Sequence, residues 1–225
     1  SDPRLVRYVA KAKLPMIISA GIGVNLNTIQ EIINWIKEEN TDPDLTFLHC
    51  NNAYPTPFED ICLSQIQKIK KMHYNHPIKV GISDHTLGIL VPPLAVALGA
   101  VTVEKHYTLD RNMSGPDHSF AIEPRELAQM VKNIRTTEKC LNDKIGLTNS
   151  EKDFSKAMRS IVAKKDIKKG DILTKENITT KRPSIHNSIP AREYYEIIGK
   201  EVAAEDIKED TILCWRDIGE TYVKR

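Results

Sequence analysis

From its start to about residue 142, the chain alternates between short β-branched segments and longer segments whose apolar residues recur at helical spacing. Between the first two predicted strands, Asn27 is expected to cap a helix with isoleucines at 29, 32, 33 and 36 on one face. Strands are predicted at 15–21, 45–51, 80–86 and 101–108, and further helices at about 62–72, at 89–99 and from Pro124 onward.

Four strand–helix units in succession are typical of an α/β protein with a parallel sheet. They fit a small open sheet, and they fit equally well one half of an eight-stranded barrel. The pattern of apolar positions does not choose between these two architectures.

The pattern changes after this region, which predicts a first domain over residues 1–142, a polar linker over 143–155 and a second domain over 156–225. The second domain contains an internal repeat offset by 40 positions. Val162, Asp166-Ile167-Lys168 and Ile172-Leu173 recur as Val202, Asp206-Ile207-Lys208 and Ile212-Leu213. Each copy joins short strands through a charged turn, which predicts a compact β module with approximate twofold symmetry.

Two histidines close the third and fourth predicted strands, His85 in Val80–Thr86 and His106 in Val101–Thr108. Parallel strands joined by a helix bring their carboxyl ends to the same rim, where two imidazoles can share a cation. A single histidine at a strand end is more often an ordinary polar residue, but for two at matching ends a metal site fits equally well.

Composition and charge exclude several classes of protein. The chain has 225 residues, a formal net charge of +2 and 40% hydrophobic residues. Its lysines are interspersed with acids, which does not favour binding of nucleic acid. The four cysteines are isolated in sequence and are expected to be reduced thiols. No segment has the pattern of a signal peptide or a membrane span, so a cytoplasmic protein without a membrane partner is expected.

Several motifs resemble those of the N-acetylneuraminate (sialic acid) synthase family, in the family's order and over almost the whole chain. They are His49-Cys-Asn-Asn-Ala-Tyr-Pro-Thr-Pro57, Gly81-Ile-Ser-Asp-His-Thr86, Glu104-Lys-His-Tyr-Thr108, Gly115-Pro-Asp117 and Lys181-Arg-Pro183. The resemblance implies the second half of a TIM (β/α)8 barrel followed by a small β-rich antifreeze-like (SAF, β-clip) domain. Members of this family condense phosphoenolpyruvate with N-acetylmannosamine or a related sugar.

The resemblance implies that His85 and His106 hold a divalent cation, Mn²⁺ or alternatively Mg²⁺, which polarises the sugar aldehyde. It implies a catalytic position for Asp117 too, in contact with the amino sugar near the metal. From the residues alone, Asp117 fits a turn residue after Gly115-Pro116 equally well.

Other polar residues near the predicted strand ends resemble positions that bind substrate. Asn52, Ser83 and Ser19 resemble residues that hold phosphoenolpyruvate through hydrogen bonds, although without the family each is an ordinary loop polar group. Tyr54 is implied to line the sugar pocket, and a half-buried packing tyrosine is the alternative.

Arg182 is implied to reach the substrate of a partner subunit, because in this family the antifreeze-like domain of one subunit covers the barrel of the other. A guanidinium suits this role, since it stays charged and donates several hydrogen bonds in a fixed geometry. Without the family it is an ordinary solvated charge. The implied assembly is a homodimer with exchanged C-terminal domains.

The sequence departs from the family in beginning just before the fifth barrel strand. A companion chain is therefore an alternative partner, supplying the first barrel half, and the chain alone is expected to be inactive. The leading function is the synthase reaction. The alternatives are a legionaminate-type or spore-coat polysaccharide sugar synthase, a non-catalytic sugar-binding paralogue, and a different metal-dependent lyase or aldolase.

Overall fold

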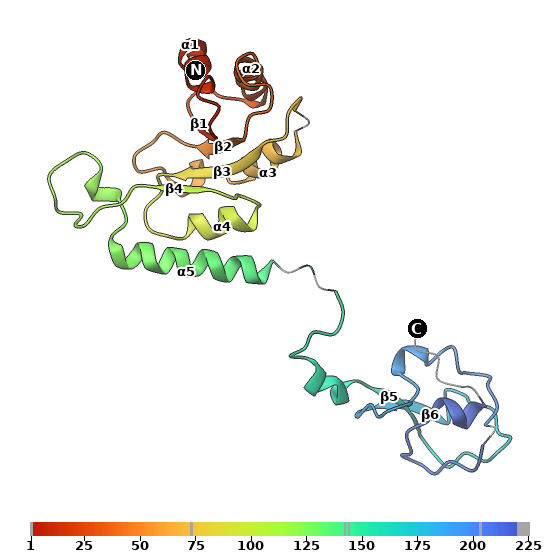
Figure 1. The fold of residues 1–225 in the computed structure, drawn as a ribbon. Helices are drawn as coiled ribbons and strands as arrows, with labels where there is room; N and C mark the ends of the chain where they lie inside the picture. The colour runs from red at the N-terminus through yellow and green to blue at the C-terminus, as the bar shows by residue number, and fades with distance from the viewer. Residues whose placement is uncertain (1, 73, 142, 144, 203, 220–225) are drawn as a thin grey trace. The chain divides into compact units, whose positions relative to one another are not determined.

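The computed structural model describes residues 2–72, 74–141, 143, 145–202 and 204–219. The chain forms two compact units, Ser1–Asp143 and Lys144–Arg225, and each is described by itself (Figure 1). Asn142, the predicted end of the first domain, and Ala203, next to a repeated valine, lie outside the described residues. None of the described helices is long and apolar enough to cross a membrane.

The first unit is built on a four-stranded parallel sheet in the order β1-β2-β3-β4, as the alternating pattern predicted. The fourth strand is shorter than expected, because after Lys105 the chain turns from β3 to pair with a returning segment at Ile122. The strands are β1 (Met16–Ala20), β2 (Leu45–Cys50), β3 (Lys79–Asp84) and β4 (Val103–Lys105).

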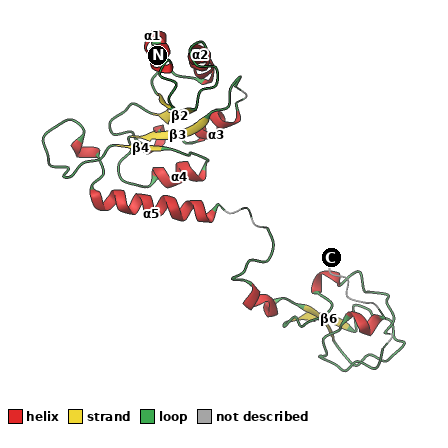
Figure 2. Ribbon diagram, in the orientation of Figure 1, coloured by secondary structure: helices red, strands yellow, loops and turns green. Residues whose placement is uncertain are grey.

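α2 (Leu26–Lys37), α3 (Ser64–Lys71) and α4 (Val91–Ala97) each connect two consecutive strands (Figures 1 and 2). α4 packs on β3 and on α5, and α1 packs on α2. Short 3₁₀ turns lie at 58–60, 118–120, 152–157, 191–193 and 215–218. The α-helices are α1 (Pro3–Ala10), α2 (Leu26–Lys37), α3 (Ser64–Lys71), α4 (Val91–Ala97) and α5 (Pro124–Cys140).

The cap of α2 differs from the prediction. Asn25, not Asn27, is the N-cap, and its side-chain oxygen accepts from the backbone N–H groups of Asn27 and Thr28 at 2.9 and 3.1 Å. Asn25 has the extended backbone of a cap residue, whereas Asn27 already lies inside the first turn. Two asparagines this close to a helix start are alike in sequence, and backbone geometry selects between them.

The two faces of the sheet have different roles, because successive side chains of a strand point to opposite sides. One face forms the core, where Phe47 and Ile82 are fully buried together with Ile33 of α2 and Ile66 of α3. The other face carries Ser19, Cys50, Ser83 and Glu104, the last three being partners in register across β2, β3 and β4. Polar residues therefore gather on the face away from the helices, toward the carboxyl ends of the strands.

The second unit contains the predicted twofold relation between its repeats. β5 (Ser160–Ala163) pairs with β6 (Ile178–Lys181) in antiparallel fashion. Ile167 and Ile207 exchange two backbone hydrogen bonds of 2.8 Å. The flanking charges also pair across the repeat, Lys168 with Asp206 and Lys208 with Asp166, both at 2.7 Å. The two copies therefore contact each other through equivalent residues.

Candidate functional site

The sheet brings His85 and His106 together, as their positions after two adjacent parallel strands predicted. His85 follows β3, His106 follows β4, and the residues just before them, Asp84 and Lys105, are partners in register. The two ring centroids lie 5.2 Å apart in an edge-on arrangement. Two imidazoles at this separation can bind one small ion or one small ligand.

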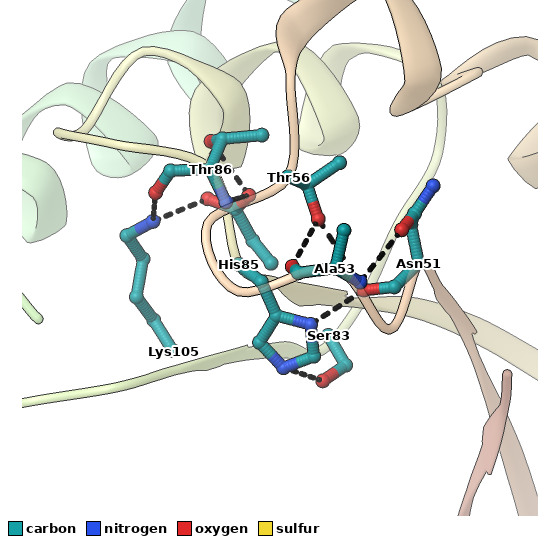
Figure 3. A network of polar contacts seen from close by, with 8 residues as sticks. Asn51, Ala53, Thr56, Ser83, His85, Thr86 and Lys105 are labelled. Atoms are coloured by element: carbon teal, nitrogen blue, oxygen red, sulfur yellow. Dashed lines mark hydrogen bonds and ion pairs between the residues drawn. The ribbon is translucent and has the colours of Figure 1, made fainter. Parts of the chain in front are cut away.

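The ring of His85 is held in one orientation by the loop that follows β2 (Figure 3). Its Nδ1 lies 2.6 Å from the backbone oxygen of Asn51. Because a carbonyl oxygen only accepts, Nδ1 carries the proton, and Nε2 of the neutral ring keeps its lone pair. Thr56 donates its backbone N–H to the carbonyl of His85 at 3.0 Å. The loop thus contacts His85 at both its ring and its backbone.

Glu104 lies beside this imidazole, although the sequence did not indicate it as a site residue. The hydroxyl of Ser83 donates to Glu104 Oε1 at 2.6 Å and lies 3.5 Å from Nε2 of His85. Since the proton of Ser83 is directed to Glu104, the lone pair of Nε2 stays available within the described part of the chain. The signal for Glu104 was its place two residues before His106, on the same face of the strand.

Aromatic side chains surround the two imidazoles. The ring centroid of Tyr54 lies 4.2 Å from that of His85 and 5.7 Å from that of His106, and Phe120 lies 5.0 Å from His106. Tyr54 is 50% exposed, whereas Phe120 is buried. Tyr54 is therefore a partly exposed ring beside the histidines, whereas the ring that contacts His106 from Phe120 is buried.

Asp117 lies on the loop that leads from β4 to α5, and its Oδ2 is 3.6 Å from Nδ1 of His106. Its side chain is 60% exposed. A hydrogen bond of 2.7 Å between Thr108 and His118 closes the base of this loop. The predicted partner of the histidine site is therefore adjacent to it, with its carboxylate facing solvent.

Asn52 connects the end of β1 to the site. Its Oδ1 accepts from the backbone N–H of Ile22 at 3.0 Å, and its Nδ2 lies 3.5 Å from the hydroxyl of Tyr54. Ser19 is exposed on β1, in register with Leu48 of β2, so two strands separate it from β4. The structure thus groups Asn52 with the histidines, and Ser19 stands apart from them on the same face.

Ser83 and Arg182 have different surroundings from one another. Ser83 is 2% exposed, so its hydroxyl lies behind His85 and Glu104 and not at the open surface. Arg182 belongs to the second unit, where it is exposed and directly follows β6.

Cys50 neighbours Ser83 on the site face, and burial raises the pKa of its thiol. A thiol with a raised pKa stays protonated near neutral pH and is a poor nucleophile.

The residues present fit a divalent cation. His85 has the arrangement of a metal-ligating histidine, with Nδ1 donating to a carbonyl and Nε2 on the opposite side of the ring. Among the described residues, no three histidine, cysteine or acidic side chains form a cluster able to hold a metal ion. The chain therefore offers two imidazole ligands, and a cation held by them would keep several positions for water or substrate oxygens.

Comparison with known proteins gives the family. The model of the NeuB family matches residues 1–146, and that of the SAF domain matches residues 158–219. An uncharacterised protein of Methanocaldococcus jannaschii is 44% identical over 216 residues, which are 95% of this chain and 62% of that protein. The N,N'-diacetyllegionaminic acid synthase of Campylobacter jejuni is 41% identical over 211 residues, covering 92% of this chain and 61% of that enzyme.

Solved structures agree with this grouping. N-acetylneuraminic acid synthetase of Leptospira borgpetersenii has 34% sequence identity and a TM-score of 0.60, over 67% of this chain and 51% of that one. The chain spans about three fifths of the length of the two relatives described above. With a family model covering most of its length, the chain belongs to the NeuB family, with half of a TIM barrel as its first unit and an SAF domain as its second.

Proposed function

We propose that this chain carries the metal and sugar sites of an enzyme that condenses phosphoenolpyruvate with N-acetylmannosamine or a related N-acetylated amino sugar. The observation that carries the proposal is the pair of imidazoles at the ends of β3 and β4, one of them held through its Nδ1 by a backbone carbonyl. The synthase names of the relatives support the same reaction class.

A divalent cation, Mn²⁺ or alternatively Mg²⁺, bound to His85 and His106 would supply Lewis acidity toward the aldehyde oxygen of the open-chain sugar. The residues around it bind and orient the reactants. Tyr54 offers an aromatic face next to the histidines, and the exposed carboxylate of Asp117 can accept hydrogen bonds from sugar hydroxyls. Both contacts would fix the sugar with its aldehyde toward the imidazoles.

The phosphoenolpyruvate side of the reaction is proposed to use Asn52, with Ser83 and Ser19 on the same face of the sheet. The amide of Asn52 can donate to a carboxylate or phosphate, since its Oδ1 is already bound to the backbone of Ile22. The hydroxyl of Ser83 donates to Glu104, so it would have to break this hydrogen bond before it could donate to the substrate.

Direct measurement of Mn²⁺ binding tests the metal site. The intact chain is expected to bind Mn²⁺ in an electron paramagnetic resonance titration, and His85→Ala and His106→Ala are each expected to lose most of the affinity. His76→Ala is the matched control, because His76 is also buried and also bonds a carbonyl, that of Pro43, at 2.6 Å. Equal affinity in all three variants and the parent would remove the metal site.

The reaction itself is tested by phosphate release from phosphoenolpyruvate in the presence of N-acetylmannosamine. The assay uses the chain combined with a companion that supplies the four preceding βα units of a relative. Activity that depends on both substrates and is lost in His85→Ala supports the synthase. Sugar binding without phosphate release in the assembled barrel would favour the alternative, a non-catalytic sugar-binding paralogue.

A legionaminate-type acceptor is the second candidate, favoured by the 41% identity to the N,N'-diacetyllegionaminic acid synthase. The same assay separates the two acceptors when N-acetylmannosamine competes with a diacetylated, deoxygenated amino sugar. The acceptor with the higher kcat/KM identifies the substrate.

The proposed assembly is a homodimer in which Arg182 of one subunit reaches substrate bound by the other. An exposed arginine directly after β6 supports this, since a guanidinium can donate in a fixed geometry to several oxygens. Heterodimers of Arg182→Ala with His85→Ala would contain one site with both lesions and one with neither. Recovered activity in such mixtures supports the exchange, and a flat response in verified heterodimers contradicts it.

A further inference from the structure

A buried ion pair lies on the far side of the sheet from the two histidines. Lys105 Nζ lies 2.8 Å from Asp84 Oδ2, and the side chains of Lys105 and Asp84 are 4% and 0% exposed. Asp84 comes directly before His85, and Lys105 comes directly before His106. Because side chains alternate along a strand, the charged residues point to the helix face and the histidines point to the site face.

The contacts of this pair enclose the backbone of His85 (Figure 3). Lys105 Nζ also donates to the backbone oxygen of Thr86 at 2.6 Å. Asp84 Oδ1 accepts from both the backbone N–H and the hydroxyl of Thr86, at 2.9 and 2.7 Å. The residues on either side of His85 therefore bond one another and Lys105, the residue directly before His106.

The backbone pairing alone holds these strands weakly at this point. β4 is three residues long, and its last pair in register with β3 is Asp84 with Lys105. Beyond that pair the chain turns to Ile122, so the side-chain contacts are what join the two strands next to the histidines. Burying two charges carries a desolvation penalty that apolar residues would avoid, so the pair is a weak explanation for stability.

We propose that Asp84 and Lys105 are positioning residues that fix the separation and orientation of the two imidazoles and thereby set the affinity of the site for a divalent cation. The inference rests on the proposed metal site for its consequence, but the positioning itself is a property of the metal-free chain. These residues act on the imidazoles through the backbone, because Asp84 and Thr86 flank His85 and Lys105 directly precedes His106.

The test compares variants of the intact chain. Asp84→Asn and Lys105→Met each remove the ion pair. Asp84→Asn combined with Lys105→Met removes both charges, and the amide oxygen of the asparagine can still accept from the N–H and the hydroxyl of Thr86. Lys79→Met is the matched control, because Lys79 forms an exposed ion pair of 2.8 Å with Asp44 at the opposite end of β3.

Two measurements are made on each variant. In the metal-free chain, nuclear Overhauser effects between the rings of His85 and His106, and the nitrogen shifts of His85, report ring separation and tautomer. Titration with Mn²⁺ reports affinity. The single variants and the double variant are expected to weaken the ring contacts and to lower Mn²⁺ affinity about 10- to 100-fold. Lys79→Met is expected to match the parent.

The double variant separates positioning from stability. An unchanged unfolding midpoint with altered ring contacts and weaker Mn²⁺ binding supports the proposal even if the single variants fail to fold. Ring contacts and affinity equal to those of Lys79→Met in the folded double variant overturn it. If the parent chain binds no Mn²⁺, the proposed metal site fails, and the metal-free ring contacts still decide whether the pair positions the histidines.

Discussion

Replacing Gly21 with alanine is expected to displace Asn52 while leaving the free energy of unfolding nearly unchanged. A Cβ at Gly21 would lie 2.1 Å from Oδ1 of Asn52 and 3.0 Å from its Cγ. Non-bonded atoms do not approach so closely, and Asn52 is an exposed side chain that can rotate away. The rotation breaks the hydrogen bond of 3.0 Å from the Ile22 N–H to Asn52.

The expected change in stability follows from two opposing effects. Loss of the hydrogen bond costs about 0.5–1.5 kcal/mol. Gly21 is not in the left-handed region, so alanine fits its backbone and lowers the entropy of the unfolded chain, which stabilises by about 0.4–1 kcal/mol. The net change is therefore within about 1 kcal/mol of zero. Gly21→Ala is thus expected to move Asn52, a predicted substrate-binding residue, without unfolding the protein.

Gly81→Ala is the contrasting variant, because its Cβ would lie 2.5 Å from the backbone oxygen of Thr102 and 2.5 Å from Cδ2 of the fully buried Leu48. Neither can move freely, so a loss of about 1–3 kcal/mol or more is expected. Urea denaturation measures the free energy of unfolding of both variants. The side-chain amide resonances of Asn52 report whether the Asn52 side chain has moved. The reasoning is refuted if Gly21→Ala costs as much as Gly81→Ala, or if the Asn52 resonances stay unchanged.

Two further predictions concern titratable groups. Burial raises the pKa of Cys50, so iodoacetamide near pH 8 is expected to alkylate Cys50 much more slowly than the exposed Cys62, and equal rates by peptide mass spectrometry would contradict this. The hydrogen bond from Arg111 lowers the pKa of Glu126 in the folded protein. The ion pair is partly exposed, so it is expected to stabilise the folded state by about 0.5–1 kcal/mol. This stabilisation is present above the ordinary pKa of glutamate and is lost as the pH falls through the lower pKa of the folded state. The stability difference between the parent and Glu126→Gln should therefore shrink from about pH 6 to about pH 3, and a constant difference would contradict the assignment.

The sequence predicted the sheet and the meeting of the histidines because both depend on local pattern. Apolar periodicity located the four strands, and parallel strands necessarily bring their carboxyl ends to one rim. What the sequence did not predict depends on register or on backbone atoms. Glu104 contacts Ser83 only because the two residues are opposite in register. The ring of His85 is oriented by the backbone carbonyl of Asn51, and a backbone contact cannot be predicted from the identity of the side chain at that position.

The residues that precede the two histidines carry opposite charges, and the register of the strands places these charges opposite each other. Asp84 ends the third strand and precedes His85, and Lys105 ends the fourth strand and precedes His106, so each histidine follows a charged residue and the two charges are opposite. Alternation turns both charges toward the helix face, where an unpaired ion would be costly, and register places them opposite each other. A shift of one residue between β3 and β4 would separate the two imidazoles and also leave two buried charges unpaired. The penalty of burying charge therefore favours the same alignment of strands that brings the histidines to 5.2 Å.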